Sequence, residues 1–191
     1  GRSVRFDSFA TARIGIVTGA NSHFIRARDE LKKLDVPARA RTGIVSRTKW
    51  LSGLEFTAQD HENVAASGSR AFLVRPTPAL EDKPGILRWV VEGEEAGVHE
   101  HYKCAKRHPW FRVDLPPRPD AFVTSTRLGP PLLVLNRTSY RCTNALYAVR
   151  FIRGESFCPE SIALGFLTTF VALWVELNGR RYGGGWGAAG R

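Results

Sequence analysis

The stretch EHYKCAKRHPWFR at residues 100–112 sets basic residues among aromatic ones and passes from a helix-like pattern into a strand-like end. Its cations are Lys103, Lys106, Arg107 and Arg112. Cations neutralise phosphates and aromatic faces stack on bases, so this mixture favours contact with nucleic acid over a merely solvated surface. Because Lys103 and Arg107 are four residues apart, they would share one face of a helix.

This stretch begins the more positive half of the chain. The 191 residues carry a formal net charge of +10. Residues 1–100 hold 15 basic and 13 acidic side chains, whereas residues 101–191 hold 13 basic and 5 acidic ones. Arginine supplies 22 of the 28 cations, which suits bidentate binding of phosphate but also follows from a GC-rich genome. The asymmetry predicts a polyanion-binding face in the second half.

Hydrophobic periodicity predicts an α+β fold with short antiparallel strands. Strands are expected at residues 12–18, 43–46, 71–74, 110–113, 121–125, 132–135 and 145–151. Helices are expected at residues 24–34 and 86–96, and Ser161–Leu177 is predicted to be one long apolar helix near the C-terminus. The chain can form one domain over residues 1–191, with a possible subdivision near residues 80–100. The polar region 48–69 is a candidate for loops that determine DNA sequence preference.

Cysteine usage and hydropathy favour a cytoplasmic protein. The cysteines Cys104, Cys142 and Cys158 form no CxxC pair and no disulfide framework, which is typical of a reducing compartment. No signal peptide opens the chain, and the most apolar run is too short to span a membrane. Methionine is absent even at position 1, so we expect the sequence to be a segment of a longer protein.

No catalytic motif is recognisable in the sequence. Residues 183–187 have P-loop-like glycines but follow a helix rather than a strand, and residues 15–19 lack the context of a Rossmann fingerprint. Three histidines and a cysteine within residues 99–108 are permitted zinc ligands, but their spacing matches no standard zinc pattern, so no metal site is predicted. The sequence therefore favours recognition, while an enzymatic activity of the chain itself stays uncertain.

Five motifs carry a family resemblance. They are GIVTGANSHFI at 15–25, the expected helix at 86–97, YKCAKRHPWF at 102–111, PLLVLN at 131–136 with NALY at 144–147, and NGRRYGGG at 178–185. Their order resembles the C-terminal target-recognition region of adenine-specific DNA methyltransferases of restriction-modification systems, the TaqI-like group. The catalytic Asn-Pro-Pro-Tyr loop and the S-adenosylmethionine site of such enzymes have no counterpart in these residues.

The resemblance implies a domain that binds double-stranded DNA for an N-terminal methyltransferase domain of the same parent protein. No cofactor is expected in this chain, and S-adenosylmethionine is expected in the parent. Charge and resemblance together give the candidate DNA contacts Lys103, Lys106, Arg107, Arg112, Asn21, Asn136, Arg137 and Arg181. The candidate structural anchors are Trp110, Gly19, Gly183 and Gly184.

Two alternatives remain open from the residues. Asn21 could cap the helix expected at 24–34 instead of contacting DNA. The whole chain could instead be a protein-interaction or structural module, in which the apolar helix Ser161–Leu177 docks on a partner and the basic surface is only compositional. A complete small enzyme with an unrecognised site is a third possibility.

Overall fold

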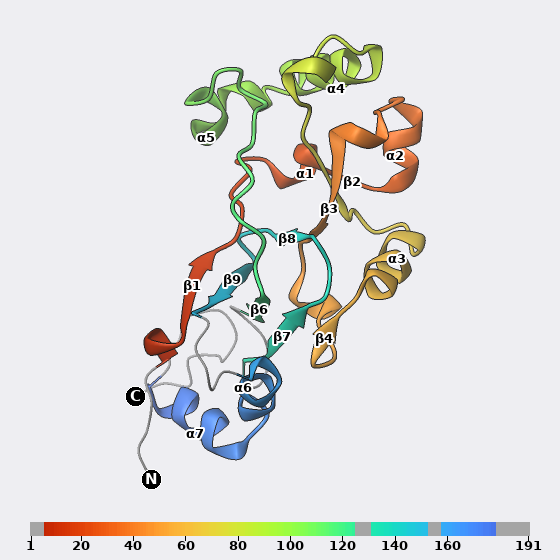
Figure 1. Ribbon diagram of the computed structural model, residues 1–191. Helices are drawn as coiled ribbons and strands as arrows, with labels where there is room; N and C mark the ends of the chain where they lie inside the picture. The colour runs from red at the N-terminus through yellow and green to blue at the C-terminus, as the bar shows by residue number, and fades with distance from the viewer. Residues whose placement is uncertain (1–5, 125–130, 153–157, 179–191) are drawn as a thin grey trace, which may run out of the picture.

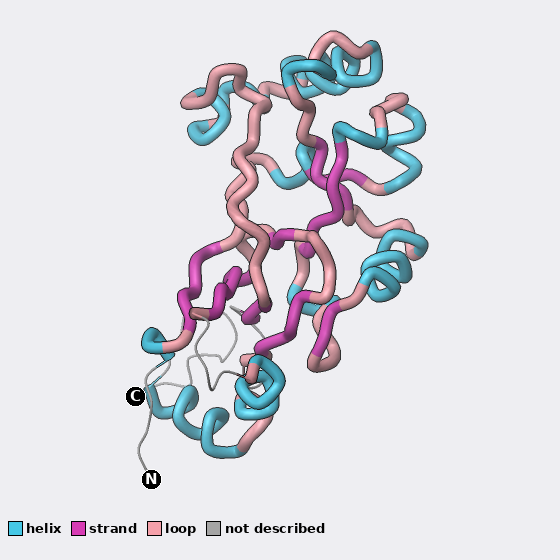
Figure 2. Tube along the Cα trace, viewed as in Figure 1, coloured by secondary structure: helices cyan, strands magenta, loops and turns pink. Residues whose placement is uncertain are grey.

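The computed structural model describes residues 6–124, 131–152 and 158–178, and in these ranges two mixed β-sheets are covered by short helices (Figure 1). Strands alternate with helices in the first half, and the later strands follow one another with loops between them (Figure 2). The α+β class expected from the sequence is confirmed, although both sheets contain a parallel pair of strands.

The first sheet has five strands and is antiparallel except at one edge. Its strand order is β1 (Ala10–Ile14), β9 (Leu146–Phe151), β6 (Ala121–Thr124), β7 (Leu133–Asn136) and β4 (Glu55–Phe56). β1 pairs with β9 from Ala10↔Phe151 to Ile14↔Tyr147, whereas β4 runs parallel to β7. Directly opposed residues share a face of the sheet, so this register fixes which side chains meet the core.

The second sheet is smaller and is linked to the first through the turn between β8 and β9. Its strand order is β2 (Ile25–Arg26), β5 (Phe72–Val74), β3 (Arg41–Val45) and β8 (Arg141–Cys142). Just beyond β8, Thr143 forms a parallel bridge with Ile16, which follows β1. The chain passes so closely there that a Cβ on Gly15 would lie 2.2 Å from the carbonyl oxygen of Thr143. Glycine at this position therefore allows the two sheets to join.

The described ranges contain seven α-helices, most of them short. They are α1 (Asn21–Phe24), α2 (Arg28–Lys33), α3 (Ala58–Ala66), α4 (Pro84–Glu95), α5 (Tyr102–Ala105), α6 (Pro159–Gly165) and α7 (Thr169–Asn178). The 3₁₀ turns are η1 (Phe6–Ser8), η2 (Ala38–Ala40), η3 (Thr48–Trp50), η4 (Pro78–Leu80) and η5 (Val98–Glu100). Within the described residues, no helix is long and apolar enough to cross a membrane.

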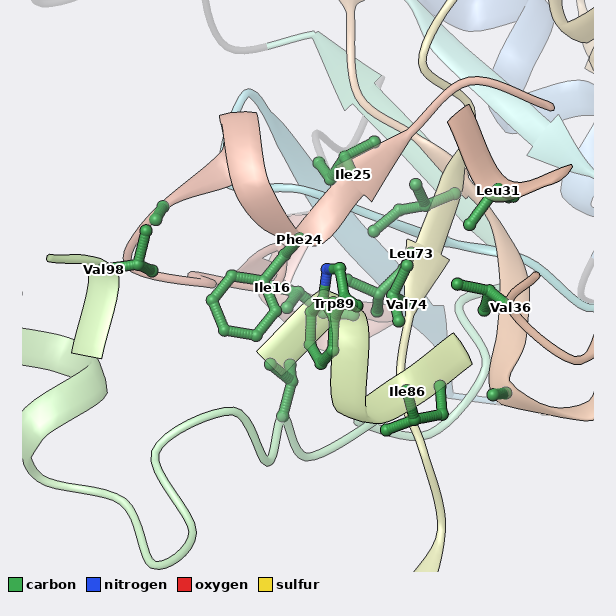
Figure 3. Close-up of a cluster of buried hydrophobic side chains, with 14 of the residues drawn as sticks. Ile16, Phe24, Ile25, Leu31, Val36, Leu73, Val74, Ile86, Trp89 and Val98 are labelled. Atoms are coloured by element: carbon green, nitrogen blue, oxygen red, sulfur yellow. The ribbon is translucent and has the colours of Figure 1, made fainter. Parts of the chain in front are cut away.

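The largest hydrophobic cluster lies between the second sheet and helices α1, α2 and α4 (Figure 3). Trp89 and Phe24 are fully buried in it, and their rings meet edge to face at 5.6 Å between centroids. Burying side chains of this size contributes roughly 2–3 kcal/mol each. Two smaller clusters cover the two faces of the first sheet, one around Phe122 and one where Ala163 of α6 packs against the strands.

The long helix predicted at Ser161–Leu177 is wrong, because the structure divides it into α6 and α7. Thr168 stands at the break. Its backbone amide donates to the carbonyl of Gly165 at 3.1 Å, and its hydroxyl donates to the same carbonyl at 2.7 Å. The hydroxyl oxygen also accepts from the amide of Val171 at 3.4 Å, as an N-cap residue does. The apolar composition of the segment concealed this local stop signal.

The helix predicted at residues 24–34 is also divided. α1 ends at Phe24, Ile25 and Arg26 then pair with β5, and α2 begins at Arg28. The carboxylate of Glu30 accepts from the amide of Ala27 at 2.7 Å and so stabilises the start of the second helix. Pairing with a distant strand overrides the helical periodicity here.

The predicted strand at residues 110–113 is absent. The amide of Arg112 donates to the carbonyl of Pro109 at 3.0 Å and closes a turn, while Trp110 and Phe111 both pack against the largest cluster. Neighbouring side chains of a strand would point to opposite faces instead.

The polar region 48–69, expected to form loops, contains η3, β4 and α3. Thr57 and Asp60 form a capping box at the start of α3: the Asp60 amide donates to Thr57 Oγ1 at 3.2 Å, and the Thr57 amide donates to the Asp60 carboxylate at 2.8 Å. The sequence contains this pattern as T-x-x-D at residues 57–60, and it could have predicted the start of helix α3.

A buried histidine stands beside a buried arginine at the edge of the largest cluster. His23 is 4% exposed and stacks on Trp89 with 4.7 Å between ring centroids. Arg26 is 6% exposed, approaches His23 Nδ1 to 3.2 Å and donates to Glu92 at 2.7 Å. Burial, and second the charge of Arg26, lower the pKa of His23 to about 4. His23 is therefore neutral in the folded protein at physiological pH.

We expect stability to rise with pH between about 4 and 6.5, because the unfolded chain takes up a proton on His23 there and the folded chain does not. This pH-dependent contribution of His23 to the free energy of unfolding is fully present above pH 6.5 and is lost near pH 4. It is on the order of 2 kcal/mol after allowance for solvent screening. Urea unfolding across this range should give a shallower pH slope for His23→Gln.

The pKa of the buried His61 is also lowered by burial, so this residue changes the free energy of unfolding with pH in the same direction. The pH slope of His61→Gln is therefore measured beside that of His23→Gln. The acids near Arg26 are Glu30 and Glu92, and the lowered pKa of Glu30 affects stability chiefly below 4.5. An unchanged slope between pH 4.5 and 6.5 in His23→Gln would contradict this account.

Candidate nucleic-acid interface

Helix α5 packs against the loop that leads from β1 to α1. Gly19 in this loop has φ +93°, and a Cβ on it would lie 2.9 Å from Lys103 Cβ and 3.0 Å from Cys104 Sγ. Both the positive φ and the close approach require glycine. Cys104 is fully buried at this contact, with its sulfur 3.7 Å from the carbonyl oxygen of Thr18.

Arg107 fastens the loop to the end of α5. Its Nη1 donates to the carbonyl of Thr18 at 2.6 Å, and its Nη2 donates to that of Val17 at 2.8 Å. The guanidinium carbon also lies 6.0 Å from the ring centroid of Phe24. Sequence reasoning placed Arg107 with Lys103 on one helical face, but α5 ends at Ala105 and Arg107 points back to the protein. Its fork is thus engaged in holding the loop.

An exposed aromatic ring of α5 lies near two lysine side chains, one from the helix and one from its C-cap residue. Tyr102 is 67% exposed, and its ring centroid lies 5.7 Å from Lys103 Nζ and 4.1 Å from Lys106 Nζ. Lys106 also donates to the Tyr102 hydroxyl at 2.7 Å. We call these three residues the α5 cluster. Tyr102 was not among the expected contacts, although its position next to Lys103 and four residues before Lys106 was the available signal.

Asn21 lies two residues after Gly19, at the end of the loop that packs against α5. It is exposed at the first turn of α1, where the N-cap position is occupied by Ala20 and no side chain caps the helix. Its Oδ1 accepts from Thr18 Oγ1 at 2.6 Å, and its Nδ2 donates to Asn144 Oδ1 at 3.4 Å. Asn21 therefore links the loop to the turn between β8 and β9 instead of capping the helix through its own side chain.

Two of the other expected contacts are engaged in ion pairs on the surface. Arg112 Nη2 lies 3.0 Å from Glu81 Oε1. Arg137 Nη2 lies 2.7 Å from Glu160 Oε1 and also binds Glu55. The hydrogen bonds to these two acids raise the pKa of Arg137. The structure does not bring Arg112 or Arg137 into the α5 cluster.

Asn136 is buried, with 2% of its surface exposed, and its side chain organises the turn after β7. Its Nδ2 donates to the carbonyls of Pro119 and Tyr140 at 2.9 and 3.0 Å. Its Oδ1 accepts from both the amide and the hydroxyl of Thr138. All of its polar groups are thus satisfied within the protein. A base edge could reach this amide only if the turn opened.

Trp110 covers the outer side of the buried histidine. Its ring centroid lies 5.6 Å from that of His23 and 6.2 Å from that of Trp89, and its Nε1 donates to Glu94 at 3.2 Å. A Cβ on Gly93 would lie 2.5 Å from the Trp110 ring, so α4 needs glycine at this contact. The ring is half-buried against the largest cluster rather than free to stack on a base.

The remaining expected residues Arg181, Gly183 and Gly184 lie outside the described ranges. In the part of the chain that the structure describes, no group of three or more His, Cys, Asp or Glu side chains could hold a metal ion.

Two cations that the sequence did not single out lie on one face of the first sheet. The register Thr11↔Arg150 and Arg13↔Ala148 puts Arg13 and Arg150 on the same side of β1 and β9. Both are exposed, and neither has an acidic partner among the described residues. Arg13 lies on β1, the strand that leads into the Gly19 loop.

The arrangement defines a class: an α+β domain that presents a basic and aromatic helix beside a pair of exposed amides. The chain belongs to the family "Type II methyltransferase M.Eco57I, C-terminal domain", which it matches over residues 1–187. It is similar to the type II methyltransferase M.AccI of Acinetobacter calcoaceticus, with 24% identity over 192 residues. That alignment covers 95% of this chain and 34% of M.AccI, so the chain spans about a third of this relative's length. The expected kinship with the C-terminal regions of such methyltransferases is confirmed.

We expect Arg107→Ala to lower the free energy of unfolding by about 1–3 kcal/mol, because the mutation leaves two carbonyls of the loop without their donors. Lys103→Ala is the control, because Lys103 is exposed and donates no hydrogen bond to the loop carbonyls. This substitution should change the free energy of unfolding by less than about 0.5 kcal/mol. Urea unfolding measures both. Equal effects of the two substitutions would show that the Arg107 hydrogen bonds do not hold the loop.

Proposed function

We propose that this chain binds double-stranded DNA as the target-recognition part of an adenine-specific DNA methyltransferase of a restriction-modification system. The single observation that carries the proposal is the α5 cluster, in which the amines of Lys103 and Lys106 lie 5.7 and 4.1 Å from the centroid of the exposed Tyr102 ring. Lysines contribute phosphate contacts, and an exposed ring can stack on a base or pack against a sugar. Membership in a family of methyltransferase C-terminal domains supports this use of the cluster.

The expected contacts take different roles in this proposal. Lys103 and Lys106 contact phosphates, and Arg107 positions the loop that carries Asn21. Arg112 and Arg137 can contribute only if a phosphate replaces their acidic partners, which costs the ion pairs described above. Residues 1–191 act as one recognition domain, and the subdivision suggested near residues 80–100 remains a prediction.

The methyl transfer itself belongs to the rest of the parent protein in this proposal. S-adenosylmethionine binds there, and the target adenine is flipped out of the duplex into that part while this chain holds the duplex in register. Such an enzyme acts on DNA in the cytoplasm. The isolated chain should therefore bind DNA without methylating it.

We expect the double substitution Lys103→Ala/Lys106→Ala to weaken duplex binding roughly 10- to 100-fold at low salt, because two phosphate contacts are lost. The slope of log K against log salt should fall in magnitude by about 1.8, or 0.9 for each phosphate. Fluorescence anisotropy with a labelled duplex measures both quantities over a salt series.

The matched control is Lys32→Ala/Lys33→Ala, which removes the same charge from exposed positions on α2. It should change the affinity several-fold less and leave the slope nearly unaltered. If both pairs weaken binding equally, the effect is one of net charge and the α5 cluster is not the contact site.

A docking surface other than the apolar helix expected from the sequence is suggested by an apolar face at one end of the first sheet, which no described segment covers. Ile14 and Tyr147 are opposed in the register and are 58% and 42% exposed. They adjoin a shallow apolar hollow lined by Phe6, Ala12, Val123, Tyr147 and Phe166. We propose that this face, which includes η1 near the beginning of the chain, docks on the N-terminal methyltransferase domain of the same parent protein.

Replacing Ile14 and Tyr147 together by serine should abolish association with a separately produced methyltransferase domain while leaving duplex binding by this chain within about twofold. Analytical ultracentrifugation of the mixed parts provides the measurement. The matched control is Leu87→Ser/Val91→Ser, because Leu87 and Val91 are exposed apolar residues on α4. Undiminished association of the Ile14/Tyr147 variant would place the docking surface elsewhere.

A further inference from the structure

We infer that Asn144 is a base-recognition residue that binds the major-groove edge of an adenine. The inference deepens the proposed function and rests on it. Asn144 was quoted within a family motif in the sequence but was not among the expected DNA contacts. Its assignment comes from a rigid backbone, an oriented side chain and free hydrogen-bonding groups beside the α5 cluster.

The backbone around Asn144 is fixed by both sheets. The amide of Asn144 donates to the carbonyl of Ile16 at 3.0 Å, and the amide of Thr143 donates to that of Val45 at 3.0 Å. Thr143 is fully buried, and its carbonyl accepts from the amide of Leu146 at 3.0 Å. A recognition residue must be held by its surroundings, because a loosely placed amide cannot select between bases.

The side chain of Asn144 is oriented by a relay of hydrogen bonds. The buried hydroxyl of Thr18 accepts from the amide of Ala20 at 3.1 Å and donates to Asn21 Oδ1 at 2.6 Å. Asn21 Nδ2 then donates to Asn144 Oδ1 at 3.4 Å. The relay runs in one direction, from hydroxyl to amide to amide, so it turns the NH₂ group of Asn144 away from Asn21.

The groups left free on Asn144 match adenine. Its Nδ2 has no partner within the described residues, and Asn144 is exposed. Its Oδ1 accepts one long hydrogen bond and keeps a second lone pair. Adenine offers an N7 acceptor and an N6 donor in the major groove, and one asparagine amide can bind both. Guanine offers two acceptors there and would leave Oδ1 without a donor.

The Gly19 loop connects this amide to α5, which carries the lysine proposed to bind phosphate. Gly19 contacts Lys103 of α5, and Asn21 follows Gly19 by two residues. A duplex held by the α5 cluster would therefore lie next to Asn144. A second exposed amide pair, Gln59 Nε2 to Asn63 Oδ1 at 2.9 Å, lies within α3 and lacks both the relay and the neighbouring lysines. It supplies a matched control for the first.

The experiment selects from a library of duplexes with a randomised centre, using the 191-residue chain and three variants at one salt concentration. The variants are Asn144→Ala, Asn144→Asp and the control Asn63→Ala. Anisotropy titrations with single duplexes, which differ only at the selected position, then give the preference of each protein for one base over another. Far-UV circular dichroism checks that each variant is folded.

We expect wild type and Asn63→Ala to prefer adenine at one position, and Asn144→Ala to lose that preference by on the order of 10- to 100-fold with other positions unchanged. Asn144→Asp keeps the size of the side chain but has no donor, so its preference should move from adenine to cytosine, whose N4 group is a donor. This isosteric variant decides the question if the alanine variant does not fold.

The inference is overturned if the Asn144 variants keep the base preference of the wild type. It is also overturned if they lose affinity equally for all sequences, because such a loss indicates a contact with the DNA backbone. In both cases Lys103- and Lys106-dependent binding would leave the proposed function standing. A chain that binds no duplex at low salt would remove the proposed function and the inference together.

Discussion

The hydrogen bonds from Arg107 to the carbonyls of Val17 and Thr18 are the interaction on which the candidate interface depends. They hold the Gly19 loop against α5, where a buried cysteine and a glycine with positive φ leave no room for a larger side chain. This contact positions the α5 cluster and Asn21 relative to each other. The two lysines and Tyr102 lie on the outer side of α5, and Asn21 lies at the end of the loop.

A second constraint fixes where the loop and α5 lie in the molecule. The Gly15 backbone passes so close to Thr143 that the turn after β8 and the chain after β1 pack directly against each other. The amides of Asn21 and Asn144 meet at this junction although 123 residues separate them in the chain. The residues that follow the loop pack into the largest cluster, where the rings of Phe24, His23 and Trp110 contact one another.

Among the described cations of this protein, two groups with different roles can be distinguished. Arg26, Arg107, Arg112 and Arg137 bind carboxylates or carbonyls of the protein itself. Lys103, Lys106, Arg13 and Arg150 have no acidic partner among the described residues. Guanidinium groups with a planar fork suit the structural role, because one side chain can satisfy two fixed acceptors. A net charge alone could not separate these groups.

The sequence by itself determined the α+β class, the approximate strands β3, β5, β6, β7 and β9, the helix α4 and the family, because local periodicity and motif order report these directly. It also indicated the stretch at residues 100–112 as a candidate DNA contact, which stays a prediction. Only the tertiary structure decided that residues 24–34 and 161–177 each divide, that Trp110 lies in a turn, and that Arg107 faces inward. Those outcomes depend on hydrogen-bond partners from distant segments, such as β5 for Ile25 and the Gly19 loop for Arg107. Periodicity reports which face of a segment is buried, but it cannot report what the segment meets there.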